Sequence, residues 1–253
     1  MNSTPQSVKN IIKKFAGRHE VFVDFSGGRY SLVLLHLVLE CVKNVKAVYI
    51  DTTITLPECN EYVNEICDKW GVNLITIKRE DTDFWQLVKK RGFPHRRFRW
   101  CMQELKSIPL KMFNEYIGND CLHLTGTTIH ESRMRKKIYE IRGIYHFNYS
   151  INSYVLHPIL YWTPEMVNKY IKKHNLPINP CYSLYGSGGN CYYCPFIRDI
   201  NYYLNLAKLR PKLFQHIIEA EESMRKGGAA IYLGRGKRVY VKDLVMNYER
   251  MPI

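Results

Sequence analysis

The sequence predicts an α/β protein built on a doubly wound, mostly parallel sheet, with a smaller cysteine-containing appendage at its C-terminal end. Short runs rich in β-branched and aromatic residues alternate with longer runs that carry helix signals, as in βαβ units. The 253 residues, 46% of them hydrophobic, suffice for one such domain and a small appendage. The pattern changes near the last cysteines, so we expect a principal domain over residues 1–180 and an appendage over 181–253.

Four runs are expected to form parallel strands. The first ends in Ser26-Gly27-Gly28, and the fourth runs into Gly126. The expected strands are 21–25, 45–50, 73–77 and 121–125. Two further runs, 231–233 and 238–241, are expected to form a β-hairpin.

Helix signals fall between these strands. Pro57 suits a first helical position, and Thr163-Pro164-Glu165 supplies an N-cap, a first-turn proline and a first-turn acid. Gly92-Phe93-Pro94 is expected to end a helix. The expected helices are 32–39, 57–70, 82–91, 105–116, 163–174 and 211–226.

The charge of the chain points to its partners. It has 37 lysines and arginines against 23 acids, a formal net charge of +14. This balance favours a nucleic acid as partner; a phosphorylated small molecule or a general basic background are the alternatives. Because the N-terminal stretch lacks the apolar core of a secretory signal and no run is long enough to span a membrane, we expect a cytoplasmic protein with reduced cysteines.

The loop Ser26 to Ser31 lies between the first strand and a helix. A glycine pair at such a turn lets backbone N–H groups and the helix N-terminus face an anion, and the hydroxyls of Ser26 and Ser31 can add donors. The local chemistry therefore predicts a cradle for nucleotide phosphates.

The same loop resembles the PP-loop of ATP pyrophosphatases, whose pattern is S-G-G-K-D-S. Arg29 stands in place of the lysine and keeps a cation, whereas Tyr30 replaces the aspartate. Across residues 20–196 the chain resembles the PAPS-reductase branch of this group and its sulfurtransferase relatives. The matching blocks are Ile50-Asp51-Thr52 with Pro57-Glu58, Arg99-Trp100-Cys101 with Leu105-Lys106, Gly126 with Glu131-Ser132 and Arg135, Trp162-Thr163, Asn179-Pro180, and Cys191 with Cys194-Pro195.

The resemblance implies a Rossmann-like, adenine nucleotide alpha hydrolase-like fold in which residues 1–180 bind an adenine nucleotide, ATP or a sulfonucleotide, with magnesium as a further candidate. It suggests Asp51 and Lys106 as candidate catalytic residues. The implied nucleotide-binding residues are Ser26, Gly27, Gly28, Arg29, Ser31, Asp51, Thr52, Gly126, Glu131, Ser132, Arg133 and Arg135.

The spacing of Cys191 and Cys194 places two thiolates on one tight loop, as in iron-sulfur and structural zinc sites. By the resemblance, Cys101 supplies a third ligand of a 4Fe-4S cluster and Cys181 is the first choice for a fourth. A three-cysteine cluster with an open iron, a zinc site, and a redox pair without metal are the alternatives.

Basic residues interleave with aromatic ones at 95–100, just before Cys101, and further basic clusters lie at 89–91, 133–137 and 235–238. Such a mixture suits phosphate contacts and base stacking, if the clusters converge on the site. We expect Tyr192, Tyr193, Tyr202 and Tyr203 to belong to the core or to shield a cluster.

Three functions are compatible with these features. The first is an ATP-dependent, iron-sulfur-assisted sulfurtransferase acting on tRNA or DNA, with a protein or a low-molecular-weight thiol as sulfur donor. The second is a reductase of adenosine or phosphoadenosine phosphosulfate, although no cysteine follows Cys194 to act as the nucleophile usual in such reductases. The third is a non-catalytic module that binds nucleotides or nucleic acids.

Overall fold

The computed structural model describes residues 4–118, 121–186, 190–197, 199–224, 228, 230–233 and 237–243. These residues form two compact units. Unit 1 takes in the described residues of 1–50, 60–77 and 107–179, and unit 2 those of 51–59, 78–106 and 180–253. Unit 2 therefore combines the C-terminal part of the chain with two segments from its first half.

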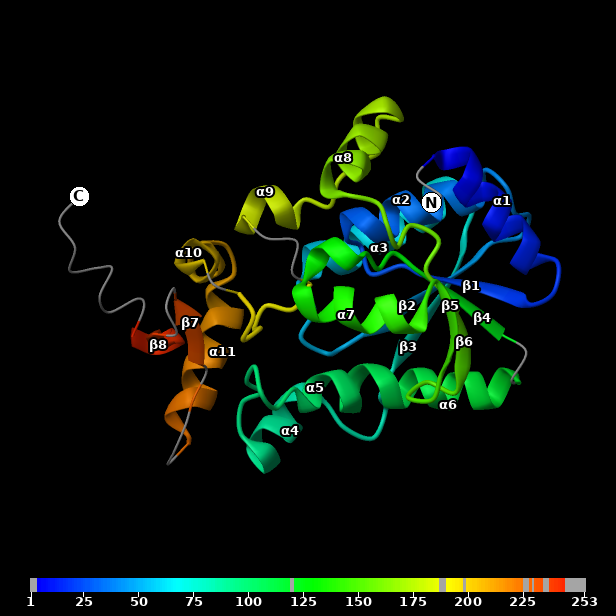
Figure 1. The fold of residues 1–253 in the computed structure, drawn as a ribbon. Coiled ribbons are helices and arrows are strands. Elements are labelled where there is room, and N and C mark those ends of the chain that lie inside the picture. Colours follow the sequence, from blue (N-terminus) through cyan, green and yellow to red (C-terminus); the bar gives the residue numbers. More distant parts are fainter. Residues whose placement is uncertain are drawn as a thin grey trace. The chain divides into compact units, whose positions relative to one another are not determined.

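A six-stranded sheet is the centre of unit 1, with strand order β3-β2-β1-β4-β6-β5 (Figure 1). Strand β1 pairs in parallel with β2 and β4, β4 pairs in parallel with β6, and β5 is antiparallel to β6. The strands are β1 (Glu20–Asp24), β2 (Lys46–Asp51), β3 (Asn73–Lys78), β4 (Cys121–Thr125), β5 (Tyr145–Asn148) and β6 (Ser153–Leu156). The predicted doubly wound, mostly parallel α/β sheet is confirmed, whereas β5 and β6 were not predicted.

Helices cover both faces of this sheet: α6 lies on one side, and α1 and α2 lie on the other (Figure 1). On the α6 side, Leu110 belongs to a buried cluster with Phe22, Val48 and Ile77 from three neighbouring strands. The helices of unit 1 are α1 (Pro5–Ala16), α2 (Arg29–Leu39), most of α3 (Pro57–Trp70), α6 (Ile108–Ile117), the 3-10 turn η2 (Ile129–Glu131), α7 (Arg133–Arg142) and α8 (Pro164–Lys173).

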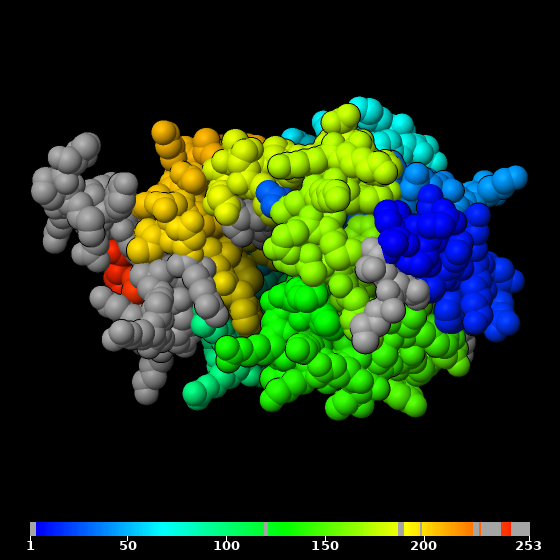
Figure 2. All heavy atoms as spheres, turned by 45° about the horizontal axis from the view of Figure 1, so that its top comes forward, coloured from blue at the N-terminus to red at the C-terminus, as the bar shows by residue number. Residues whose placement is uncertain are grey.

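Two of these helices differ in how they are anchored. Helix α2 buries seven of its eleven residues, which is why its sequence is apolar almost all round. Helix α7 buries none, and its green atoms lie open on the surface in Figure 2. The predicted helix at 105–116 forms, but the five residues Gln103–Ser107 just before α6 adopt a π-helical turn.

Unit 2 is held together by aromatic side chains. Phe84, Trp100, Tyr193, Tyr202 and Tyr203 are each at most 2% exposed, and the four tyrosines expected in the core are all buried. Its elements are α4 (Phe84–Arg91), α5 (Trp100–Met102), η1 (Gln103–Ser107), α9 (Cys181–Tyr185), α10 (Ile200–Leu209), α11 (Pro211–Glu222), β7 (Ala230–Leu233) and β8 (Lys237–Tyr240).

The predicted C-terminal hairpin is confirmed, because β7 and β8 pair antiparallel; most of its turn lies outside the described residues. The predicted helix at 211–226 ends at Glu222, with Ser223 as its C-cap. In the part of the chain that the structure describes, no helix has both the length and the apolar character needed to cross a bilayer.

Candidate nucleotide loop and cysteine pocket

The loop at which we expect a phosphate cradle lies in unit 1, where β1 leads into α2. Gly27 has a φ of 76°, a conformation that favours glycine, and Gly28 is the N-cap of α2. The hydroxyl oxygens of Ser26 and Ser31 are 3.2 Å apart, and the Ser31 hydroxyl donates to the Gly28 carbonyl at 3.0 Å. Gly28 has no side chain that could accept hydrogen bonds from the first-turn amides of α2. These N–H groups can therefore donate to a bound anion.

Asn179 holds this loop in place from a distant part of the chain. Its side chain is 2% exposed, and its Nδ2 donates to the Gly27 carbonyl at 3.1 Å. We did not predict this role, although the Asn179-Pro180 pair lies in one of the matching sequence blocks.

Gly126 follows β4, the parallel neighbour of β1, and so lies at the same edge of the sheet as the loop. A Cβ atom at this position would lie 2.7 Å from the backbone nitrogen of Ser31 and from the carbonyl carbon of Tyr30. Only glycine therefore lets the backbone after β4 approach the first turn of α2 this closely.

The residues that follow Gly126 mainly organise one another. The Glu131 carboxylate accepts from the Thr128 amide at 3.1 Å and pairs with the Arg135 guanidinium. Ser132 caps α7 by accepting from the Arg135 amide at 3.1 Å. Arg133 is exposed at the start of α7. Their roles toward a nucleotide remain predictions.

A buried polar network that the sequence did not reveal lies beneath the phosphate loop. His123 on β4 contacts Asp24 on β1 (Nδ1 to Oδ1, 2.7 Å) and Asn114 on α6 (Nε2 to Oδ1, 2.8 Å). Burial opposes the charge on His123, but the adjacent Asp24 carboxylate outweighs it and raises the pKa of His123 to about 9. The ring is then an imidazolium that donates from both nitrogens.

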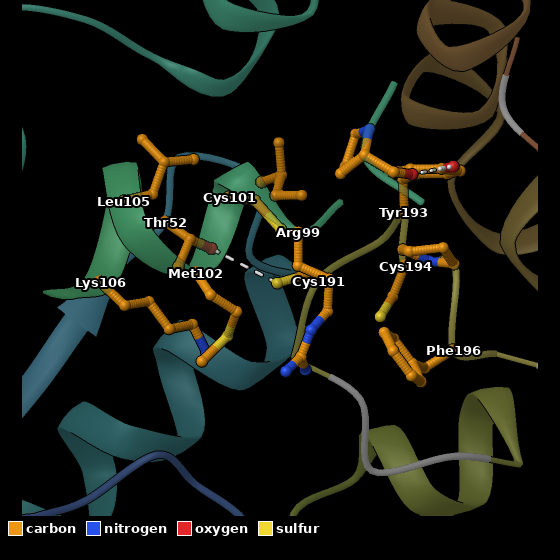
Figure 3. A pocket seen from close by; sticks show the side chains of 13 residues that line it. Thr52, Arg99, Cys101, Met102, Leu105, Lys106, Cys191, Tyr193, Cys194 and Phe196 are labelled. Atoms are coloured by element: carbon orange, nitrogen blue, oxygen red, sulfur yellow. Dashed lines mark hydrogen bonds between the residues drawn. The ribbon is translucent and has the colours of Figure 1, made fainter. Parts of the chain in front are cut away.

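Unit 2 contains a cavity that gathers three of the predicted cysteine ligands, shown in Figure 3. Cys101 comes from α5, and Cys191 and Cys194 come from the loop before α10. The lining residues are Thr52, Ile54, Pro94, Arg99, Cys101, Met102, Leu105, Lys106, Cys191, Tyr193, Cys194, Pro195 and Phe196. The predicted site residues Thr52 and Lys106 are thus brought together with the cysteines.

The cysteine loop is fastened to the segment after β2. The Leu56 amide donates to the Asn190 carbonyl at 2.7 Å, and the Tyr192 amide donates to the Ile54 carbonyl at 2.9 Å. The Thr52 hydroxyl lies 3.4 Å from the Cys191 sulfur, the contact dashed in Figure 3.

Buried tyrosines fix the loop from its other side. The Tyr202 hydroxyl donates to the Cys191 carbonyl at 2.9 Å, and the Tyr203 hydroxyl donates to the Cys194 carbonyl at 3.2 Å. Because these hydroxyls bond the backbone, the cysteine loop is held rigidly without use of its sulfur atoms.

Burial and neighbouring thiols raise the pKa of two of these cysteines, Cys101 and Cys194. Burial, followed by the proximity of Cys191 and Cys194, raises the pKa of Cys101 to about 11. Burial and Cys191 likewise raise the pKa of Cys194. A bound metal cation would relieve this repulsion between thiolates.

Cys181 lies elsewhere in unit 2. It begins α9, is 1% exposed and is not among the residues that line the cavity. Burial, then Cys59 and Glu58, raise its pKa to about 12. Its role as a fourth ligand stays a prediction that the structure does not favour.

Asp51, a predicted catalytic candidate, shapes the turn after β2. Its Oδ1 accepts from the Thr53 amide at 2.8 Å, and Thr53 has a φ of 64°. The Thr53 hydroxyl in turn accepts from the Phe84 amide at 2.9 Å. This carboxylate therefore has a structural contact, and a catalytic role remains a proposal.

Cations and aromatic rings surround the cysteine pocket. His95 and Phe98 close a tight turn through two backbone hydrogen bonds of 3.1 and 3.0 Å. The guanidinium carbons of Arg99 and Arg96 lie 5.0 and 5.7 Å from the ring centre of Phe196, which is 44% exposed. Of the predicted basic and aromatic stretch at 95–100, Arg99 lines the pocket and Arg96 contacts Phe196 at its edge. Part of the cluster at 235–238 lies outside the described residues.

The fold and this loop define a class of α/β proteins that bind nucleotides at the carboxyl ends of parallel strands. Residues 20–195 match the phosphoadenosine phosphosulfate reductase domain. The chain belongs to this family, as the sequence resemblance predicted.

Individual relatives differ in length from the chain. It is 32% identical over 190 residues to an uncharacterized protein of Methanocaldococcus jannaschii, a match covering 74% of this chain and 38% of that protein. The match to a second protein from this organism covers 51% of that protein, so the chain spans less than two thirds of the length of either relative.

Two solved structures show the same fold at low sequence identity. The phosphoadenylyl-sulfate reductase of Candida auris has a TM-score of 0.55 and 18% identity, over 75% of this chain and 89% of that one. The U34-tRNA thiolase NcsA of Methanococcus maripaludis, solved with its 4Fe-4S cluster, has a TM-score of 0.52 and 15% identity, over 98% of this chain and 80% of that one.

Proposed function

We propose that this chain is an ATP-dependent, iron-sulfur-assisted sulfurtransferase that acts on nucleic acid. The observation that carries the proposal is one cavity in unit 2 that combines three cysteines with cations and an exposed aromatic ring. A small sulfonucleotide would use a few cations at its sulfate and phosphates, whereas a polynucleotide would also use cations and exposed rings around the mouth of the pocket.

The donor set fits an iron-sulfur cluster. Cys101, Cys191 and Cys194 offer thiolates, and among the described residues that line the cavity there is no histidine or carboxylate. Thiolates also bind structural zinc, so zinc is the alternative occupant that metal analysis distinguishes from a cluster.

Three thiolates would hold such a cluster, which when bound would supply an iron with an open position for a sulfur-containing ligand. The chain's own groups have distinct tasks. Tyr202 and Tyr203 hold the backbone of the two loop cysteines, and Lys106 places a cation beside the thiols. The apolar side chains of Met102, Leu105 and Phe196 limit the access of water.

The phosphate cradle of unit 1 supports the use of ATP. The amides of α2 and the hydroxyls of Ser26 and Ser31 would bind the phosphates. In the proposed reaction an acceptor oxygen attacks the α-phosphorus and releases pyrophosphate, and sulfur then displaces AMP from the acceptor. Tyr30, in place of the family's aspartate, makes pyrophosphate release the step to test first.

The cations beside the thiols favour a polynucleotide acceptor. Among the described residues, no carboxylate lies within ion-pairing distance of Arg97, Arg99 or Lys106. Phe98 and Phe196 next to them are 50% and 44% exposed. Cations that lack acidic partners suit phosphates, and exposed rings suit stacking of unpaired bases.

Anaerobic purification followed by iron and sulfide analysis and sequencing of co-purifying nucleic acid tests the proposal. The protein is then incubated with ATP, sulfide and that nucleic acid. We expect pyrophosphate and a thiolated nucleotide; Cys191→Ser should lose the thiolated nucleotide, whereas Cys41→Ser, whose thiol lies in unit 1, should retain both products. Sulfite release from phosphoadenosine phosphosulfate without thiolation would favour the reductase, and neither product would favour a binding module.

A further inference from the structure

A second group of metal-binding side chains lies in unit 1, outside both sites described above. His36 and Glu40 are one helical turn apart at the end of α2, and His174 is the C-cap of α8. Ligand atoms from these three residues all lie within 4.8 Å of one another. Neither the phosphate loop nor the cysteine pocket uses them.

Neighbouring side chains hold the three ligands in position. The Tyr170 hydroxyl lies 2.9 Å from His36 Nδ1 and donates to Glu40 Oε2 at 3.0 Å. The Tyr170 ring stacks on His174 with centres 4.2 Å apart, and Trp70 packs edge-on against His36. This network hydrogen-bonds His36 and Glu40 and packs the His174 ring in place, so it keeps the donors together as the surroundings of a metal site do.

The electrostatic setting favours a cation. Helices α2 and α8 both end here, and helix C-termini carry partial negative charge. Lys9 Nζ already lies 3.8 Å from Glu40 Oε2, so the site attracts positive charge. The side chains of His36 and Glu40 are 24% and 34% exposed, which leaves a path for an ion to enter.

We propose that His36, Glu40 and His174 bind one divalent transition-metal ion, with Zn²⁺ as the natural occupant. Two imidazoles and one carboxylate suit Zn²⁺ and its neighbours in the first transition row, whereas Mg²⁺ and Ca²⁺ prefer oxygen donors. The fourth position falls to water or to the Tyr170 hydroxyl, which lies between His36 and Glu40. The ion would join the C-terminal ends of α2 and α8 and so brace the helix that begins at the phosphate loop.

Co²⁺ is a suitable probe, because its visible absorption reports nitrogen and oxygen ligands while thiolates add a strong near-ultraviolet band. The Cys191→Ser/Cys194→Ser protein is titrated so that the cysteine pocket does not compete. We expect one equivalent of Co²⁺ to bind with visible bands and no thiolate band. Glu40→Gln, which keeps the shape of the side chain, and His174→Ala should each weaken binding at least about tenfold, whereas His130→Ala, at an exposed histidine, should not.

Two further measurements keep the proposal falsifiable if the cysteine variant folds poorly. Dialysis of the unaltered protein against Zn²⁺ should leave one more zinc per chain than dialysis of His174→Ala. Lys9→Gln should tighten binding about fivefold, because it removes a competing cation at Glu40. Equal zinc content in both proteins, or Co²⁺ affinity unaffected by Glu40→Gln and His174→Ala, would overturn the assignment.

Discussion

The fully buried His123 and the partly buried Asp24 form an ion pair between the neighbouring parallel strands β4 and β1, with 2.7 Å between Nδ1 and Oδ1. Asp24 lies two residues before Ser26, so this pair anchors the strand from which the phosphate loop departs. Cys121 and Ser153 continue the polar network, with their side-chain atoms 3.2 Å apart.

The ion pair predicts a pH-dependent stability. The Asp24 carboxylate raises the pKa of His123 from 6.5 to about 9, although burial opposes this rise. The contribution of the ion pair to the free energy of unfolding is therefore complete below pH 6.5 and is lost as the pH rises through 9. Urea unfolding should show Asp24→Asn less stable than the unaltered protein by up to about 3 kcal/mol at pH 6. The difference should nearly vanish by pH 10. Glu20→Gln, at an exposed pair with Lys46, should show no such trend; a constant Asp24→Asn penalty would contradict the assignment.

Gly126→Ala tests the close approach between the loop after β4 and α2. The added methyl group would meet backbone atoms at 2.7 Å and displace the first turn of α2. We expect a loss of about 1–3 kcal/mol in stability and weaker binding of ATP, measured by calorimetry. Gly17→Ala is the matched control, because its methyl group would meet no atom closer than 3.8 Å and its φ is −76°. Equal ATP affinity in both variants would refute the argument.

Cysteine variants test whether three or four cysteines bind the proposed iron-sulfur cluster. Cys101→Ser and Cys194→Ser remove thiols from the cavity and should reduce iron in anaerobically prepared protein to a small fraction. Cys181→Ser changes a thiol outside the cavity lining and should keep full iron content. Loss of iron from Cys181→Ser, with the fold intact by circular dichroism, would restore it as fourth ligand.

The surface beside the thiols predicts two separable effects on nucleic-acid binding. Phe196→Ala should weaken single-strand binding about tenfold through lost stacking, with little change in salt dependence. Arg99→Gln should lower the slope of log affinity against log salt by about one. Tyr149→Ala removes an aromatic ring that is 84% exposed in unit 1 and is the control. Unchanged binding in all three variants would remove nucleic acid as the substrate held by this surface.

Local signals explain which parts of the fold were predictable. The first four strands combine β-branched runs with turn residues, and the helices at 57–70 and 163–174 have clear N-terminal signals. Strands β5 and β6 are only four residues long, and they pair through contacts that local sequence does not encode. Helix α1 was missed although its local signals are clear: Thr4 caps it, Pro5 begins it, and its apolar residues recur at helical spacing.

The candidate site also has features that local sequence predicted and features that it did not. The phosphate loop and the C-x-x-C spacing are local patterns, and the structure contains both. The roles of Asn179 and His123 depend on partners 152 and 99 residues away in the chain, and no local pattern shows such pairing. Cys181 is close to Cys191 in sequence, yet it begins a helix and turns into the core beside Cys59.

Unit 2 is assembled from three separate segments, and each contributes to the cysteine pocket. During synthesis Thr52 and Cys101 leave the ribosome long before Cys191 and Cys194. The nascent chain therefore carries one of the three cysteines of the pocket, with Phe93 not yet packed against Tyr193, until residues beyond 190 emerge. The pocket can therefore be completed only after residues beyond 190 have emerged, and a ribosome that stalls before residue 190 would release a product that lacks two of the three cysteines of the pocket.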